Sequence, residues 1–105
     1  MNQIFITEFA LSKHAIARAQ QRCIRMTDIQ EISIYGRPYH AGSGIYAYHV
    51  GRREVKHARL QGIRIDHLLD KAILIKLEID GTFVVLTVQH SSNIPKHWHP
   101  ARSVG

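Results

Sequence analysis

The chain has 105 residues, of which 45% are hydrophobic and 21% charged, and its 14 Lys and Arg against eight Asp and Glu give a formal net charge of +6. This composition excludes a disordered chain and predicts one domain over residues 1–105, with a body at about 11–90 and a C-terminal tail at 91–105. The basic balance favours a polyanionic partner, nucleic acid before an anionic membrane surface.

The first residues, MNQIFITEFALSKH, lack the basic start and long apolar run of a signal peptide. The longest apolar-rich stretch, KAILIKLEIDGTFVVLTVQ, is interrupted by charges and an Asp-Gly pair, which argues against a membrane span. Cys23 is the single cysteine, so an intrachain disulfide and a metal site of paired cysteines are both excluded. We therefore expect a cytoplasmic protein that does not associate with a membrane.

Two helices are expected at the start of the body, as an αα-hairpin over residues 12–36. Ser12 is a suitable N-cap for a helix from about Lys13 to Arg22. The apolar positions of this helix, Leu11, Ala15, Ala19 and Cys23, lie near one face, which predicts a buried Cys23 thiol.

A second helix is expected to begin at Thr27 or Asp28, because Thr27-x-x-Gln30 fits a capping box. Gly36 is a suitable stop for this helix, and Pro38 follows it closely.

The hydrophobic period then changes to two. GIYAYHV, residues 44–50, predicts a strand with Ile45, Ala47 and His49 on one side and Tyr46, Tyr48 and Val50 on the other. GRREVKHARLQGIR, residues 51–64, is basic and predicts a ragged strand with a loop, and DHLLDK predicts a short helical turn.

The last regular element is a hairpin. AILIKLEI and TFVVLTVQH flank Asp80-Gly81, which predicts a two-residue turn. That register would pair Ile75 with Leu86 and Ile73 with Val88 on an apolar core face. It would place Leu74 opposite Thr87 and Lys76 opposite Val85 on a mixed face open to solvent. In the tail, Trp98 is expected to dock on the body and the final residues to fray.

The predicted order of elements indicates an α+β fold. Two N-terminal helices would pack on one face of a three- to four-stranded antiparallel sheet and leave the other face open.

His14, Arg18 and Arg22 follow a strict four-residue step on the first predicted helix. They would form a stripe spanning roughly 80° and about 12 Å of helix axis, at the border between core and solvent. Arginine binds phosphate bidentately and stays charged. A histidine in the first turn of a helix favours the neutral imidazole, which can act as a general base. A solvated helix face would give the same spacing by chance.

Eight histidines and a scarcity of carboxylates narrow the possible chemistry. No Gly-x-Ser-x-Gly, phosphate-binding glycine loop or pair of carboxylates is present, whereas histidine and cationic residues can together cleave RNA without a metal. We expect no metal and no cofactor, although His97-x-His99 is half of a metal-binding pattern. The cations expected to contact nucleic acid are Arg22, Arg52, Arg53, Lys56 and Lys76.

The segment SKHAIARAQQRCIRMTDIQEISIYGR, residues 12–37, resembles the start of a family of small bacterial domains of unknown function, and DGTFVVLTV is similar to that family's last strands. The family is grouped with the barnase–EndoU–colicin–RelE superfamily of ribonuclease toxins, which place N-terminal helices before a four-stranded antiparallel sheet. The resemblance implies site residues His14, Arg18 and Arg22 on the first helix and Thr87 and His90 on the last strand. Cys23 stands where that family tends to have glycine.

The leading hypothesis is a metal-independent, ribonuclease-like toxin with an antitoxin or immunity protein as partner. Arg18 and Arg22 would hold the scissile phosphate of RNA, and Thr87 would orient it. His14 would act as base or acid, with His49 or His90 as the complementary group. The alternatives are a non-catalytic module that binds nucleic acid and a protein-interaction subunit.

Overall fold

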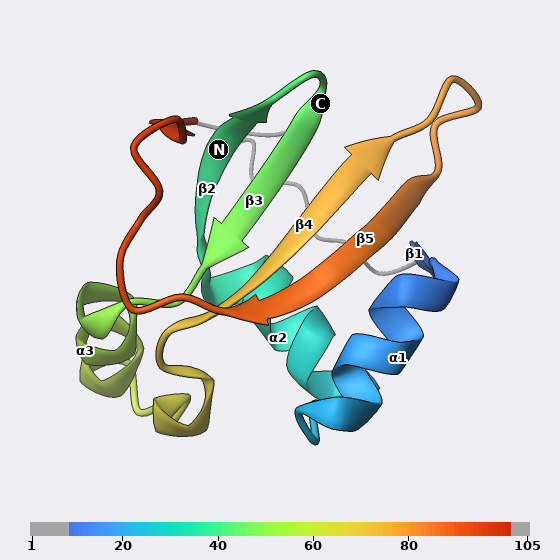
Figure 1. The fold of residues 1–105 in the computed structure, drawn as a ribbon. Coiled ribbons are helices and arrows are strands. Elements are labelled where there is room, and N and C mark those ends of the chain that lie inside the picture. Colours follow the sequence, from blue (N-terminus) through green and yellow to red (C-terminus); the bar gives the residue numbers. More distant parts are fainter. Residues whose placement is uncertain (1–8, 102–105) are drawn as a thin grey trace.

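The computed structural model describes residues 9–101, which form an α+β fold with three α-helices and a six-stranded, mostly antiparallel sheet (Figure 1). The strand order is β1-β5-β4-β3-β2-β6, and only the β1–β5 pair is parallel. The sheet therefore has more strands than the sequence predicted, and it is mixed. The strands are β1 (Phe9–Leu11), β2 (Arg37–Gly42), β3 (Ile45–His49), β4 (Lys71–Leu77), β5 (Phe83–His90) and β6 (His99–Pro100).

Helix α1 (Lys13–Gln21) begins where the sequence predicted. The Ser12 hydroxyl oxygen accepts the Ala15 N–H at 3.0 Å, and the same hydroxyl donates to the Leu86 carbonyl at 2.8 Å. Ser12 thus caps α1 and also fastens its first turn to β5. Ala15 and Ala19 are buried as expected, but Cys23 is exposed. The helix ends before Cys23, which has a left-handed φ of 53°, so this residue leaves the buried face.

Helix α2 (Met26–Tyr35) begins earlier than predicted, because Arg25 is its N-cap. The Asp28 carboxylate lies inside the first turn and accepts the Arg25 backbone N–H at 2.8 Å. Gly36 ends the helix, as predicted. A Cβ atom at Gly36 would lie only 2.5 Å from the Ile32 carbonyl oxygen, which is why glycine suits this junction.

Strands β2 and β3 form a hairpin, of which the sequence predicted only the second strand. The predicted alternation in β3 is confirmed, since Tyr48 and Val50 join the core beneath the helices and Ala47 joins a cluster on the other face. Pro38 lies within β2, where a proline usually argues against a strand.

Helix α3 (Arg52–Leu60) replaces the predicted ragged strand. Glu54 accepts the Gly51 N–H at 2.9 Å and so caps the first turn, while Val55 and Ala58 bury one side. The expected short helical turn is confirmed as a 3₁₀ helix, η1 (Asp66–Leu68).

The β4–β5 hairpin is confirmed, and its register is correct at Ile73–Val88 and Leu74–Thr87. Nearer the turn the predicted register is wrong by one residue. The Glu78 N–H donates to the Thr82 carbonyl, which closes a loop of three residues, and inside it the Gly81 N–H donates to the Glu78 carbonyl. The register shifts after Leu74, so Leu86 is a bulge residue, and Val85 takes the buried place opposite Ile75.

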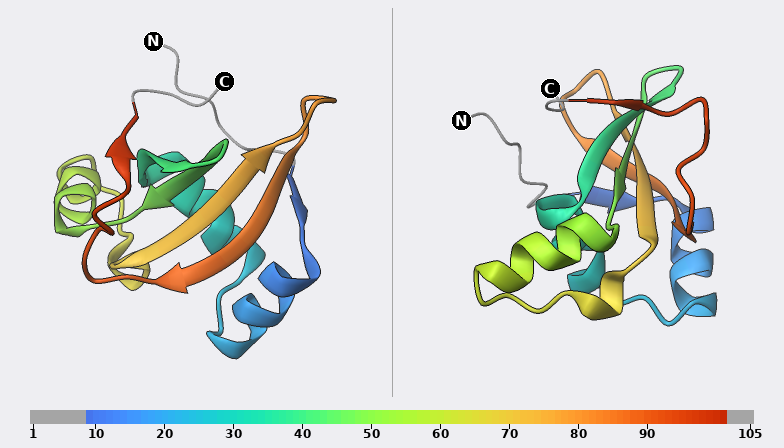
Figure 2. Two further views of the ribbon diagram at one scale, coloured as in Figure 1. Left: turned by 45° about the horizontal axis from the view of Figure 1, so that its top comes forward. Right: turned by 90° about the vertical axis from the view of Figure 1, so that its left-hand side faces the viewer.

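The two faces of the sheet are covered differently. Figure 2 shows α2 and α3 on one side of the sheet and the C-terminal segment on the other. Trp98, expected to dock, is only 6% exposed and packs with Tyr39, Ala47 and Ala72. β6 extends the sheet beside β2. The face expected to be open is therefore partly covered by the tail.

The described part of the chain, residues 9–101, contains no helix with the length and apolar content needed to cross a membrane. Residues 1–8, which open the stretch expected to lack a signal peptide, and residues 102–105 at the end of the tail expected to fray lie outside the described residues.

Candidate nucleic-acid interface

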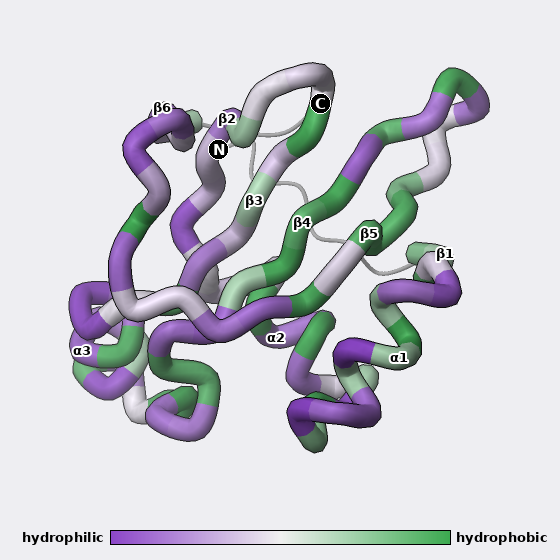
Figure 3. Tube along the Cα trace, in the orientation of Figure 1, coloured by the Kyte–Doolittle hydropathy of each residue, from purple (hydrophilic) through white to green (hydrophobic). Residues whose placement is uncertain are grey.

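Helix α3 presents a dense set of cationic side chains to solvent. Only Val55 and Ala58 of its nine residues are buried, so the other side chains face outward or lie at the border. Hydrophilic residues dominate this helix in Figure 3. The exposed basic residues are Arg52, Arg53, Lys56, His57 and Arg59, and we refer to them as the α3 basic surface.

Little negative charge balances this surface. Arg59 forms an ion pair with Asp66, and the Glu54 carboxylate accepts the Gly51 N–H at the start of the helix. Within residues 9–101, no carboxylate forms an ion pair with Arg52, Arg53 or Lys56. Three cations therefore remain available for an anionic partner.

The surface is hollowed on both sides of α3. A pocket of about 310 Å³ lies between α3 and the end of α2 and is lined by Tyr35, Arg53 and His57, together with Glu54. A second pocket of about 330 Å³ is lined by Arg52, Lys56 and Arg59, together with Asp66. An anion that enters either pocket meets cationic side chains, and the first pocket also offers an aromatic ring.

His14 and Arg18 lie in contact on α1. Arg18 Nε is 3.5 Å from His14 Nε2, and His14 is exposed while Arg18 is half-buried. Because a guanidinium can only donate, His14 Nε2 is the acceptor in this contact. Arg22 is the exposed C-cap residue of the same helix, one four-residue step further.

None of the other predicted catalytic residues is hydrogen-bonded to this pair. Thr87 is half-buried, follows the Leu86 bulge, and donates its hydroxyl proton to the Val88 carbonyl at 3.3 Å. His90 is exposed at the end of β5, three residues further and about 10 Å along the strand. Strand alternation directs these two side chains to opposite faces of the sheet.

His49 has a structural environment. It is 5% exposed, and its Nε2 lies 2.7 Å from the Ser91 carbonyl oxygen. Since a carbonyl only accepts, Nε2 carries the proton, and the bond ties the end of β3 to the chain after β5. Among the described residues, the hydrogen bonds and ion pairs connect His14 to Arg18 and do not connect either residue to Thr87, His90 or His49.

The predicted nucleic-acid contacts are likewise divided between surfaces. Arg52, Arg53 and Lys56 share α3, whereas Lys76 is exposed on β4. Alternation places Lys76 on the side of Leu74, which packs in the cluster under the tail, opposite the face that α3 covers. A single nucleic-acid interface centred on α3 therefore cannot include Lys76.

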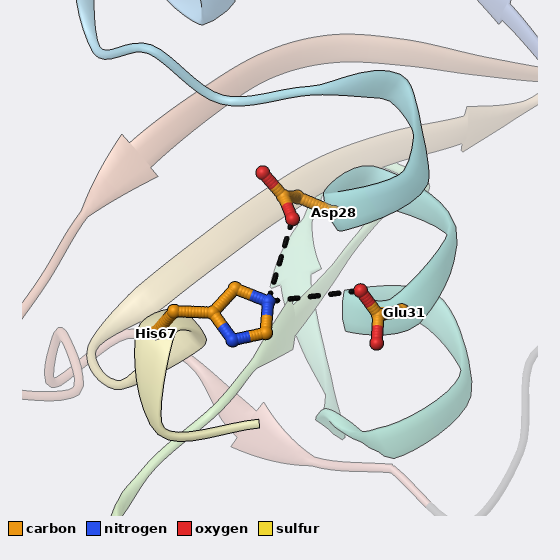
Figure 4. Close-up of side chains that lie close together, drawn as sticks. All are labelled: Asp28, Glu31 and His67. Carbon is orange, nitrogen blue, oxygen red and sulfur yellow. Dashed lines mark ion pairs between the residues drawn. The ribbon is translucent and has the colours of Figure 1, made fainter. Parts of the chain in front are cut away.

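A cluster that the sequence reading missed joins α2 to η1 (Figure 4). His67 Nε2 lies 3.5 Å from Asp28 Oδ1 and 3.7 Å from Glu31 Oε1. The Asp28-x-x-Glu31 spacing puts both carboxylates on one side of a helix, so the expectation that the chain has no pair of carboxylates is wrong. His67 is 36 residues beyond Glu31, so only the tertiary structure reveals the third member.

The pKa of Asp28 is lowered from its ordinary value of 3.8. Burial by itself raises this pKa, but three kinds of interaction outweigh it: the backbone hydrogen bond from Arg25, the side-chain hydrogen bond from Arg25, and the positive charges of Arg25 and His67. Asp28 is therefore a buried carboxylate held in its charged form.

No protein-family model matches the chain, and no curated protein or solved structure is significantly similar to it. The resemblance to ribonuclease toxins stays a prediction. The function proposed below therefore rests on the fold and the side-chain geometry.

Proposed function

We propose that this basic protein, which we place in the cytoplasm, binds single-stranded RNA through the α3 basic surface. The observation that carries the proposal is the solvent-exposed group of Arg52, Arg53 and Lys56, which has no carboxylate partner among residues 9–101. Cations of this kind bind phosphates and release the counterions condensed on the nucleic acid.

Single-stranded RNA suits the shape of the surface better than a duplex does. Splayed nucleotides place their bases in pockets, where they stack on aromatic rings or guanidinium planes. The pocket between α2 and α3 has the volume of a small-ligand site and is lined by Tyr35 and Arg53. We infer that a base stacks on the Tyr35 ring and that its phosphate binds Arg53 or His57.

The test compares two double variants that each remove two positive charges. Arg53→Gln/Lys56→Gln removes two cations from the α3 basic surface. Arg37→Gln/Lys96→Gln is the matched control, because Arg37 lies over the Tyr39 ring and Lys96 belongs to the tail, on the opposite face of the sheet. Binding to a labelled 12-nucleotide RNA is measured by fluorescence anisotropy over a series of salt concentrations.

We expect log Kobs to fall linearly with log salt for the wild type. The slope should become shallower by about 1.4 in the α3 variant, at roughly 0.7 per lost phosphate contact, and the control should change little. Equal changes in both variants would show that net charge alone is responsible, and absence of salt-dependent binding would contradict the proposal. A parallel series with DNA of the same sequence tests the choice of RNA.

A second candidate function, metal-independent RNA cleavage, is favoured by the contact between His14 and Arg18. Once the Arg18 guanidinium turns from His14 to the phosphate at which charge develops, the freed Nε2 of a neutral imidazole can accept the proton of a 2′-hydroxyl. Arg22 lies one helical step away and offers a second cation. The complementary acid is not supplied by a side chain bonded to this pair.

Cleavage is measured with RNA in EDTA for the wild type, for His14→Gln and for a control, His97→Gln, which changes an exposed histidine in the tail. The expected result is product from the wild type and the control, with at least about 100-fold less from His14→Gln, as for loss of a general base. Cleavage by all three proteins, or by none, would rule out His14 catalysis. Growth arrest on expression that Arg18→Ala relieves would support a toxin.

A further inference from the structure

The cluster of Asp28, Glu31 and His67 has the donor types and spacing of a metal site. The ligand atoms of the three residues all lie within 4.8 Å of one another. Figure 4 shows both carboxylates next to the same ring nitrogen of His67. A tetrahedral ion bound at about 2.0–2.2 Å holds its donor atoms about 3.4 Å apart. The His67–Asp28 and His67–Glu31 distances, 3.5 and 3.7 Å, are already close to that value.

Two of the three ligands are held in place before any ion binds. Asp28 is 7% exposed at its side chain, and its Oδ2 atom accepts the Arg25 N–H, which leaves Oδ1 facing His67. His67 belongs to η1, whose Leu68 is buried in the core, and its carbonyl accepts a hydrogen bond from Lys71 Nζ. Glu31 is 33% exposed at its side chain and can rotate to close the remaining gap.

The positive charge of the neighbouring Arg25 guanidinium would repel a bound cation. Arg25 Nη2 lies 3.3 Å from Asp28 Oδ1, the same oxygen that faces His67. The Arg25 side chain is 72% exposed, so its guanidinium can move into solvent while its backbone N–H keeps the bond to Oδ2. The negative charges of the two carboxylates then neutralise a divalent cation, and the neutral imidazole adds no charge.

We propose that Asp28, Glu31 and His67 bind a divalent transition-metal ion, with Zn²⁺ as the best fit, and that the ion joins α2 to η1. An imidazole nitrogen favours Zn²⁺ and related metals, whereas Mg²⁺ and Ca²⁺ prefer oxygen ligands alone. Three protein ligands leave one position of a tetrahedral ion for water, and His67, 47% exposed at its side chain, lies at the solvent-facing side. This site is separate from the RNA-binding function proposed above.

The experiment titrates Zn²⁺ into tag-free, EDTA-stripped protein by isothermal calorimetry, with Co²⁺ absorption as a second readout. The wild type should bind one ion, give visible d–d bands with Co²⁺ and melt at a higher temperature with Zn²⁺ present. His67→Gln and Glu31→Gln should each weaken binding by at least about tenfold, the lower end of the loss seen even for outer partners of metal ligands. Both changed side chains are partly exposed, so circular dichroism should show a folded protein.

The matched control is His97→Gln/His99→Gln, because exposed histidines of β6 and the tail lie near His40 on β2 and offer a metal ion a different binding place. Binding that survives in this control and is lost in His67→Gln supports the site. Binding that survives in His67→Gln and is lost in the control overturns it, as does the absence of measurable binding by the wild type. RNA binding measured in EDTA is unaffected by either result, so the two proposals fail separately.

Discussion

At the scale of single residues, Asp28 links the start of α2 to η1. Its carboxylate caps α2 through the Arg25 N–H, pairs with the Arg25 guanidinium and faces His67 on η1. A buried carboxylate with these partners is stabilised in its charged form, and its pKa is below 3.8 in the folded protein. Folding is therefore coupled to the ionisation of this one group.

The sign of the coupling follows from the direction of the pKa shift. The unfolded chain binds a proton at Asp28 more readily than the folded protein does, so the stabilisation is complete above the ordinary pKa of 3.8 and is lost as the pH falls through the lower folded value. In EDTA, Asp28→Asn should reduce the free energy of unfolding at pH 7 by about 1–2 kcal/mol. It should also flatten the acid limb of the stability profile below about pH 4. Urea unfolding at several pH values measures both effects, and an unchanged acid limb would contradict the assignment.

The cap of α1 could be predicted from the sequence, whereas the partners of His49 and His67 could not. Ser12 caps α1 as expected, because the cap and the helix are adjacent in sequence. His49 was considered as a proton-transfer group, yet its partner is the Ser91 carbonyl, 42 residues away. The role of His67 could not be predicted, since nothing near it in sequence indicates two carboxylates on another helix.

At the scale of elements, α3 is the segment that sequence reasoning most clearly misread. Its buried side is narrow, with only Val55 and Ala58, so the apolar period was hidden among charges. A signal was present: Glu54 follows Gly51 by three residues, and Gly62, with a φ of 78°, terminates the segment. The basic residues were recognised, but their placement on one helix surface required the structure.

The β4–β5 hairpin shows a different limit of prediction. Its strands and inner register followed from the hydrophobic pattern, but Asp80-Gly81 suited both a two-residue turn and the three-residue loop that forms. The longer loop shifts the register by one residue, which the Leu86 bulge restores at Thr87. The Ser12 hydroxyl donates to the Leu86 carbonyl, so the bulge coincides with the anchor of α1.

At the scale of the whole molecule, the sheet separates two surfaces of different character. The helices cover one face of the sheet, and α3 presents the α3 basic surface to solvent on that side. The tail covers part of the other face through Trp98 and β6. The predicted α+β class is correct, and the predicted open face is partly occupied. The predicted catalytic residues are spread over α1, β3 and β5, whereas the uncompensated cations are concentrated on α3, which is why binding is the better-supported function.

The most direct test of RNA binding at α3 is a titration of ¹⁵N-labelled protein with a short single-stranded RNA, followed through the backbone amide chemical shifts. We expect the largest changes at residues 52–62 and at Tyr35, on both sides of the first pocket, and we expect them to disappear at high salt. Changes confined to the tail-covered face, or no changes at low salt, would contradict an RNA interface on α3.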